Sequence, residues 1–168
     1  MRIRHESTAD YEAIRSVNED AFGRLTEAEL VEAIRATDRF LPQLSLVALV
    51  DEDVVGHVLM SYVEIEPGSR RVLQLGPLAV RRSQQRRGIG SALMLEALRA
   101  ADERGEPLVM LEGDPNYYVR FGFRESEQLG LSPPPGVSAR HFLVRTLSAY
   151  DRSVRGRVVY SEPFRAIS

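Results

Sequence analysis

The hydrophobic pattern in the central part of the chain changes once, and this change limits the possible folds most strongly. Three apolar segments follow one another with only short turns between them: Ser45–Val50, Val54–Ile65 and Arg71–Val80. Short turns of this kind join neighbouring antiparallel strands. A helical pattern then covers Gly88–Glu103, and another apolar strand follows at Pro107–Glu112. The pattern therefore predicts an antiparallel meander that continues into a strand–helix–strand crossover with parallel strands.

Weaker patterns flank this central part, and together with it they indicate an α/β (α+β) fold in one domain over residues 1–168. Before it they predict a strand at Arg2–Glu6, a helix from Ser7 or Thr8 to about Ala21, and a second helix that opens with the capping-box pattern Thr26–Glu29. After it they predict a short helix at about Pro115–Phe121, an edge segment from Gly122, a strand at His141–Leu147 and a further strand over Arg157–Phe164.

The composition excludes several kinds of chemistry. The chain has no cysteine and no lysine, and all 22 basic residues are arginine. Cysteine nucleophiles, thiolate metal sites and lysine Schiff bases are therefore excluded. The net charge of −2 does not indicate a nucleic-acid-binding face, and the three scattered histidines do not indicate a metal site. No apolar run reaches the ~20 residues that cross a bilayer. We therefore expect a cytoplasmic protein without membrane or nucleic-acid partners.

Four arginines and two glycines lie at the junction between the strand Arg71–Val80 and the crossover helix, in the sequence RRSQQRRGIG at residues 81–90. Backbone N–H groups at a helix N-terminus are unpaired and carry partial positive charge. Glycine lets the backbone approach an anion closely, so Gly88 and Gly90 predict a phosphate site. A P-loop is excluded because it needs a lysine, and Leu93 stands where a dinucleotide-binding fingerprint needs a third glycine. The alternative is a solvated basic turn.

Three motifs in this order resemble those of the GNAT superfamily of acyl-CoA-dependent N-acetyltransferases. They are PLAV at Pro77–Val80, QRRGIG at Gln85–Gly90 and YVRFGF at Tyr118–Phe123. The segments Gly113–Phe123 and Val158–Phe164 are most similar to the YhbS-like bacterial branch. The resemblance implies the acyl-CoA N-acyltransferase fold, with a mixed, mainly antiparallel sheet of six to seven strands that is flanked by helices and splays after its third strand.

The resemblance also implies an activity. It is the direct transfer of the acetyl group of acetyl-CoA to a primary amine of a small molecule, peptide or protein, without a metal. Tyr118 would be the general acid that protonates the departing thiolate, because a phenol with a pKa of about 10 is protonated at neutral pH. The backbone of Leu78–Val80 would hold the pantetheine arm, and the amides from Arg86 to Ser91 would hold the pyrophosphate. The expected CoA-binding residues are Leu78, Ala79, Val80, Gln85, Arg86, Arg87, Gly88, Ile89, Gly90, Ser91, Asn116 and Tyr118.

Several of these assignments have alternatives. Tyr118 could be a core aromatic residue, and Asn116 could be a helix cap. Glu64 is the candidate general base and Glu112 is another, whereas His57 is better explained as a buried histidine of the sheet. Many members of the superfamily deprotonate the amine through water, so one dedicated base is not required.

The function also has alternatives. One is a catalytically weak acyl-CoA-binding sensor or regulatory protein, and another is an RNA-associated factor that uses the arginine-rich turn. The acceptor groove would consist of the turn Phe22–Leu25, the strand Val54–Ile65 and the loop Leu129–Arg140. The side chains of these segments do not identify the amine acceptor. The chain is compatible with a monomer or a homodimer, and Arg81 and Arg82 could face solvent.

Overall fold

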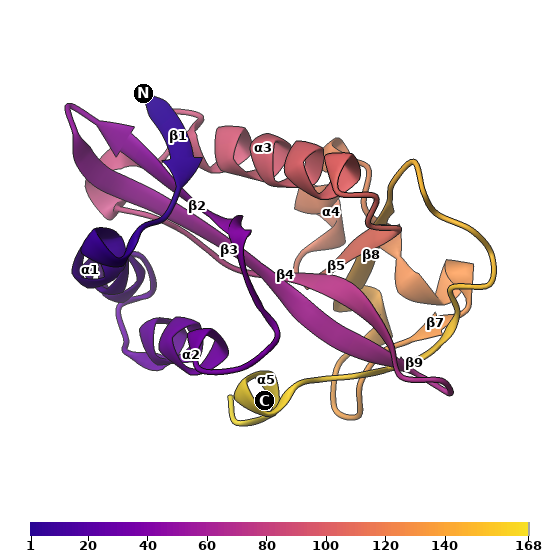
Figure 1. Ribbon diagram of the computed structural model, residues 1–168. Helices are drawn as coiled ribbons and strands as arrows, with labels where there is room; N and C mark the ends of the chain where they lie inside the picture. The colour runs from indigo at the N-terminus through magenta and orange to yellow at the C-terminus, as the bar shows by residue number, and fades with distance from the viewer. Residues whose placement is uncertain (168) are drawn as a thin grey trace. The chain divides into compact units, whose positions relative to one another are not determined.

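The computed structural model describes residues 1–167, which contain nine strands and five α-helices besides short 3-10 turns (Figure 1). The strands are β1 (Arg2–His5), β2 (Phe40–Val50), β3 (Asp53–Glu66), β4 (Arg70–Val80), β5 (Leu108–Glu112), β6 (Arg124–Glu125), β7 (Leu131–Ser132), β8 (Phe142–Thr146) and β9 (Gly156–Val159). The helices are α1 (Tyr11–Phe22), α2 (Thr26–Arg35), α3 (Ile89–Glu103), α4 (Pro115–Tyr118) and α5 (Glu162–Arg165). This is the expected mixed, mainly antiparallel class with more strands than predicted.

The chain divides into two compact units. Unit 1 contains Met1–Ser61 and Leu75–Ala100, and unit 2 contains Tyr62–Gln74 and Ala101–Ser168. Strands β3 and β4 contribute residues to both units, so each unit is described below by its own residues. The expectation of a single domain stays a prediction.

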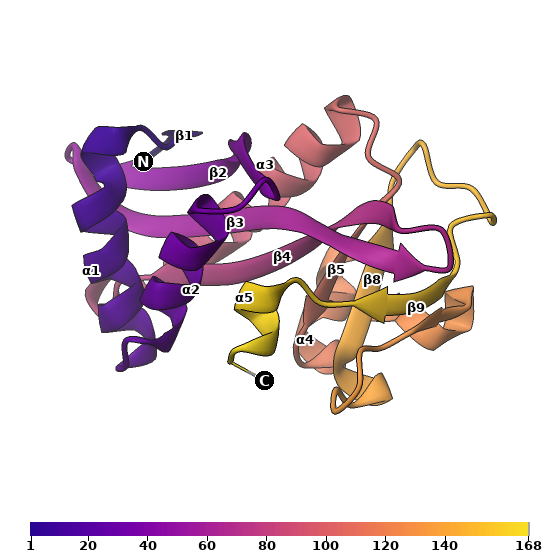
Figure 2. The same ribbon diagram turned by 60° about the horizontal axis from the view of Figure 1, so that its bottom comes forward.

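In unit 1 the predicted meander is present, with strand order β1-β2-β3-β4. The pair β1–β2 and the pair β2–β3 are antiparallel, and Val47 lies opposite His57. Figures 1 and 2 show α1 and α2 on one face of these strands and α3 on the other. Each helix buries one apolar stripe, such as Ile14 and Val17 on α1. Full burial of an aliphatic side chain stabilises by about 1.5–3 kcal/mol, so these stripes hold the layers together.

In unit 2 the predicted crossover pairing is present, since β4 and β5 are parallel with Leu73 opposite Val109. Antiparallel pairs then join β5 to β8 and β8 to β6. On the other side β9 runs antiparallel to the end of β3, and β7 runs parallel to β9 (Figure 2). The strands β6 and β7 have two residues each, too few for a pattern of alternating residues to reveal them.

The prediction of a strand over Arg157–Phe164 is wrong in its second half. Strand β9 ends at Val159, and Glu162–Arg165 forms α5. Pro163 lies in the first turn of this helix, where its missing N–H costs nothing, whereas it would remove a bond from a strand ladder. Phe164 of α5 packs against Tyr160, with ring centroids 5.3 Å apart. The apolar residues that resembled a strand are therefore an anchor for a short helix.

Several boundaries differ from the prediction, and two of them have a clear physical reason. Strand β2 begins at Phe40 rather than at Ser45, because a register shift between these residues interrupts the alternation that marks a strand. Helix α3 begins at Ile89, since the φ of 84° at Gly88 lies outside the helical region.

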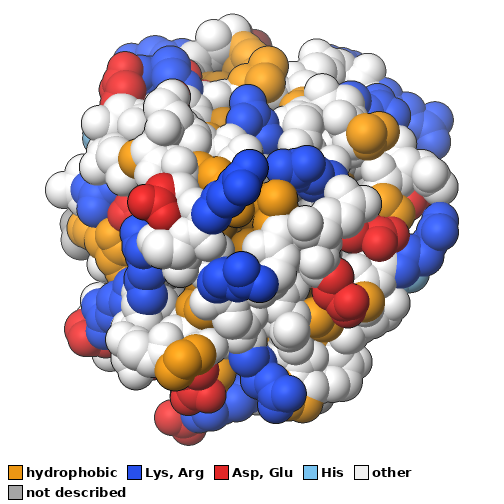
Figure 3. Space-filling model, turned by 90° about the vertical axis from the view of Figure 1, so that its right-hand side faces the viewer, with side chains coloured by type: hydrophobic (Ala, Val, Ile, Leu, Met, Phe, Trp, Pro, Cys, Tyr) orange, Lys and Arg blue, Asp and Glu red, His pale blue; other side chains and the backbone are white. Residues whose placement is uncertain are grey.

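The surface and the helices give two further observations. On the face drawn in Figure 3, basic side chains surround a hydrophobic hollow and acidic side chains lie further out, so this face is not a continuous basic surface. Within residues 1–167 no helix is long and apolar enough to cross a membrane, and no cluster of three potential metal ligands is found.

Candidate acyl-CoA site

The N-terminus of α3 in unit 1 presents a row of unpaired backbone donors. The first helical hydrogen bond runs from the Ala92 N–H to the Gly88 carbonyl, at 3.0 Å. The N–H groups of residues 88–91 donate to no acceptor in the described part of the chain. Such groups satisfy an anion well, because the helix dipole adds partial positive charge at the same point. The predicted anion site therefore has the donors that a phosphate needs.

The backbone beside these donors is uncovered. Gly88 has a left-handed φ of 84°, and a β-carbon added there would meet nothing within 4 Å. A β-carbon at Gly90 would meet only the Val80 side chain, at an ordinary 3.7 Å. The protein therefore has room for a side chain at position 90. Because glycine has no side chain, a ligand can approach the backbone there.

Contacts from α1 and β3 hold the turn that precedes α3. The Arg81 N–H donates to the Val55 carbonyl at 2.8 Å, and its guanidinium donates to the Val54 carbonyl and the Ser16 hydroxyl, both at 3.2 Å. Arg81 is therefore a structural residue of this turn and does not simply face solvent. The Arg82 N–H donates to the Asp20 carboxylate at 2.8 Å. No sequence pattern indicates this role of Asp20, because Asp20 lies 62 residues from Arg82 along the chain.

The three residues before the glycines act differently from one another. The side-chain amide of Gln85 donates to the Val80 carbonyl at 2.9 Å, so this side chain fixes the turn. The exposed Arg87 guanidinium lies 3.4 Å from the Gln84 amide oxygen. Arg86 is exposed and has a φ of 63°, with no side-chain partner in the described residues. The charges of Arg86 and Arg87 are thus available to an anion.

The end of β4 offers backbone groups on the side away from β3. The Arg81 N–H binds Val55 of β3, and the Ala79 carbonyl also faces β3, since it would lie 3.3 Å from a β-carbon at Gly56. Backbone groups alternate in direction along a strand, so those of Leu78 and Val80 point away from β3. The Ala79 side chain is buried and contributes packing only. An extended ligand could therefore pair with Leu78 and with the Val80 N–H.

Tyr118 lies in unit 2, on the short helix α4 that follows β5. The Asp114 carboxylate caps this helix by accepting from the Asn116 N–H at 2.9 Å, so Asp114 and not Asn116 is the cap. The Asn116 side chain is exposed. Tyr118 is half-buried against the backbone of Gly113, and its hydroxyl has no hydrogen-bond partner in the described residues. Burial, with a smaller effect of Tyr117, raises the pKa of Tyr118. Its phenol is therefore protonated at neutral pH and free to donate.

The three candidate bases differ in their surroundings. Glu64 is half-buried on β3 opposite Val159, and Glu112 is exposed at the end of β5 opposite Phe142. His57 is completely buried in unit 1. Only the two carboxylates are therefore accessible to a substrate.

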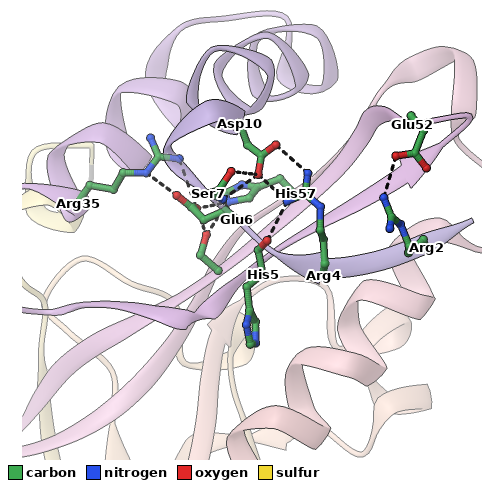
Figure 4. A network of polar contacts seen from close by, with 10 residues as sticks. Arg2, Arg4, His5, Glu6, Ser7, Asp10, Arg35, Glu52 and His57 are labelled. Atoms are coloured by element: carbon green, nitrogen blue, oxygen red, sulfur yellow. Dashed lines mark hydrogen bonds and ion pairs between the residues drawn. The ribbon is translucent and has the colours of Figure 1, made fainter.

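The predicted structural role of His57 is confirmed by a buried polar network (Figure 4). Its Nε2 lies 3.0 Å from the Ser45 hydroxyl and 3.5 Å from the Glu6 carboxylate. Ser45 also donates to Glu6, and Arg35 of α2 forms an ion pair with Glu6 at 3.0 Å. Burial lowers the pKa of His57, so the ring is neutral at pH 7. The network joins β2, β3, α2 and the residue that follows β1, and the side chains of Glu6, Ser45 and His57 lie away from solvent.

The expected acceptor segments lie in different places. In unit 1 the turn Phe22–Leu25 adjoins the arginine-rich turn, because a β-carbon at Gly23 would come within 2.7 Å of the Arg82 guanidinium. Phe22 and Leu25 are exposed there. The loop Leu129–Arg140 belongs to unit 2, and the strand Val54–Ile65 contributes to both units.

Comparison with known proteins decides the family. Residues 11–123 match the profile of the Acetyltransferase (GNAT) family. The chain belongs to this family. It is 33% identical to the N-acetyltransferase YhbS of Escherichia coli over 166 residues, which is 98% of each chain. It is 32% identical over 135 residues to the L-amino acid N-acetyltransferase AaaT of Escherichia coli, covering 72% of this chain and 81% of that protein. The GNAT resemblance and its YhbS-like branch are thus confirmed.

Solved structures of GNAT proteins show the same fold. YhbS from Escherichia coli in complex with CoA superposes with a TM-score of 0.89 at 32% identity, over 98% of this chain and 91% of that one. A GNAT family acetyltransferase from Brucella melitensis in complex with acetyl-CoA gives a TM-score of 0.80 at 32% identity, over 97% of each chain. A CoA-type co-substrate therefore fits both the family and the free donors at the start of α3.

Proposed function

We propose that this protein transfers the acetyl group of acetyl-CoA directly to a primary amine of a small molecule, peptide or protein. The observation that carries the proposal is the row of unpaired N–H groups at residues 88–91 beside the uncovered Gly90 backbone. These amides would hold the pyrophosphate, with Arg86 and Arg87 as auxiliary charges. The edge at Leu78 and Val80 would pair with the pantetheine arm. The relatives crystallised with CoA and acetyl-CoA support the choice of donor.

The reaction needs one base and one acid. The neutral amine nitrogen attacks the thioester carbonyl carbon, and the new C–N bond forms as the C–S bond breaks. The amine loses one proton to a base, and the departing CoA thiolate gains one proton from the Tyr118 hydroxyl. A tyrosine suits this step because its phenol is protonated and has no competing partner in the described residues.

For the base we propose Glu64, either directly or through a water molecule. Glu64 lies in the unit 2 part of β3 and is half-buried, so part of it is accessible to a substrate. Glu112, the alternative, interacts with Tyr160, whose pKa is raised by burial and by the Glu112 charge.

The proposal is tested by measuring thiol release from acetyl-CoA with a panel of primary amines. The panel should include small amines, free amino acids, peptides with free N-termini and lysine-containing peptides. The proposal predicts amine-dependent release and a product heavier by one acetyl group. Binding of acetyl-CoA without release on any amine would instead show the sensor function.

A further inference from the structure

A cavity lies in unit 2, and none of the residues assigned to CoA lines it. Its volume is about 440 Å³, which is within the usual range of about 300–1,000 Å³ for small-molecule sites. The walls come from the end of β3, from β9, from α5 and from the proline pair at 134–135. Tyr160 and Pro134 are buried, whereas the charged lining residues Glu66, Arg157 and Arg165 are exposed. The cavity therefore has a packed part and a charged part that is open to solvent.

The charged side chains of this cavity are two arginines and one glutamate. Glu66 and Arg157 lie directly opposite each other in the β3–β9 ladder, and Arg165 comes from the last turn of α5. Neither arginine side chain has a hydrogen bond or an ion pair in the described part of the chain. Two guanidinium groups against one carboxylate leave one net positive charge. This charge matches a monoanion, and a guanidinium binds a carboxylate through two parallel hydrogen bonds.

Tyr160 connects the cavity to the residues assigned to chemistry. It forms part of the cavity wall, and its hydroxyl lies 3.3 Å from the Gln74 side-chain nitrogen on β4. Its pKa is raised by burial and by the charge and hydrogen bond of Glu112 at the end of β5. Glu112 directly precedes Gly113, against which Tyr118 packs. Val159 of the cavity lies opposite Glu64, the proposed base. Residues of the cavity thus interact with Glu112, the alternative base, and lie opposite Glu64, the proposed base.

We propose that this cavity binds the carboxylate of the amine acceptor through Arg157 and Arg165, so that the acceptor is a small molecule that carries both an amine and a carboxylate. This inference rests on the proposed acetyl transfer, and it narrows the acceptor class. The net charge of the cavity favours a carboxylate over a phosphate, which carries more negative charge at neutral pH.

The kinetic test compares free amino acids with their primary amides as acceptors. Each pair has the same side chain, and the amide has the less basic amine. A larger fraction of the amide is therefore in the reactive neutral form at neutral pH, which favours the amide in the absence of specific binding. The proposal predicts a kcat/KM at least tenfold higher for the acid. Arg157→Gln and Arg165→Gln should each lower kcat/KM for the acid roughly tenfold, which is the loss expected for one charged hydrogen-bond partner. The kcat/KM for the amide should stay within about twofold of the wild-type value. Arg152→Gln, an exposed arginine outside the cavity, is the control.

A binding test separates this inference from the proposed function. The side-chain Nε–H resonances of Arg157 and Arg165 are followed by NMR while amino acids, or inorganic phosphate, are added without acetyl-CoA. We expect shifts with amino acids at lower concentrations than with phosphate. If these shifts occur and no amine is ever acetylated, the proposed function fails and the cavity assignment stands. Equal acetylation of acids and amides, tighter binding of phosphate, or no shift with amino acids overturns the cavity assignment.

Discussion

Tyr118 packs directly on the backbone of Gly113, with no space for a side chain between them. A β-carbon at position 113 would lie 2.8 Å from Cδ2 of the Tyr118 ring and closer still to Cε2. Gly113 is itself held, since its N–H donates to the His141 carbonyl at 2.9 Å. The backbone that follows β5 therefore sets the position of the proposed acid.

The first prediction concerns this contact. Gly113→Ala should displace the Tyr118 ring and lower kcat at least tenfold, because a small displacement of a catalytic group is costly. Acetyl-CoA affinity should stay within about twofold, and the free energy of unfolding should fall by about 1–3 kcal/mol from the steric overlap. Steady-state kinetics, calorimetry and urea unfolding measure the three quantities. Val119→Ala, at an exposed position nearby, is the control. An unchanged kcat in Gly113→Ala would show that the ring position is irrelevant to turnover.

The second prediction removes the proposed acid itself. Tyr118→Phe should lower kcat by about 10²–10⁴-fold, the usual contribution of a general acid, with acetyl-CoA affinity nearly unchanged. Tyr117→Phe, the exposed neighbouring ring, should keep the original rate. Because burial raises the pKa of Tyr118 above its ordinary value of 10.0, the wild-type acid should remain protonated up to at least that pH. A Phe variant with the wild-type rate would reject the assignment.

The third prediction concerns acid stability through the network of His57 and Glu6. Burial lowers the pKa of His57 from 6.5, so below that pH the unfolded chain binds a proton more readily than the folded one. The stability that neutral His57 contributes above pH 6.5 should therefore be lost as the pH falls through the pKa of His57 in the folded protein. The pKa of Glu6 is also lowered, because hydrogen bonds from His57, Ser45 and Arg35 outweigh the opposite effect of burial. This second loss begins below about pH 4.5, near the unperturbed pKa of a glutamate.

Urea unfolding of the wild type and of His57→Gln between pH 8 and pH 5 measures this effect. The variant should be less stable at pH 8, yet its free energy of unfolding should vary less with pH over this range. His5→Gln, at an exposed histidine, should keep the wild-type dependence. The same pH dependence in wild type and His57→Gln would contradict the account.

The sequence predicted the elements whose signals are local. Alternating apolar residues and short turns predicted the meander. The glycines at 88 and 90 indicated the N-terminus of the crossover helix. The parallel arrangement of the strands that contain Leu73 and Val109 followed from the connection rules for a crossover. These predictions held because they depend on neighbouring residues and on simple connection rules.

The remaining features depend on contacts between distant residues. The ion pair of Arg35 with Glu6 joins positions 29 residues apart, and the Gln74–Tyr160 contact joins positions 86 apart. No local pattern indicates that Arg157 and Arg165 line one cavity, because one lies on a strand and the other on a helix that was predicted as strand. Arg81 likewise resembled a solvent-facing charge until its contacts with Val54 and Ser16 were known.

The most direct test of the account is the affinity of acetyl-CoA for Gly90→Leu, measured by calorimetry. The fold should tolerate this change, since a β-carbon at position 90 meets only Val80 at an ordinary distance and leucine favours a helix. Arg99→Leu, at an exposed position on the same helix, is the control. If the amides at the start of α3 hold the pyrophosphate, Gly90→Leu should weaken binding at least tenfold, or about 1.4 kcal/mol, while the control binds normally. Unchanged affinity in Gly90→Leu would show that acetyl-CoA binds elsewhere.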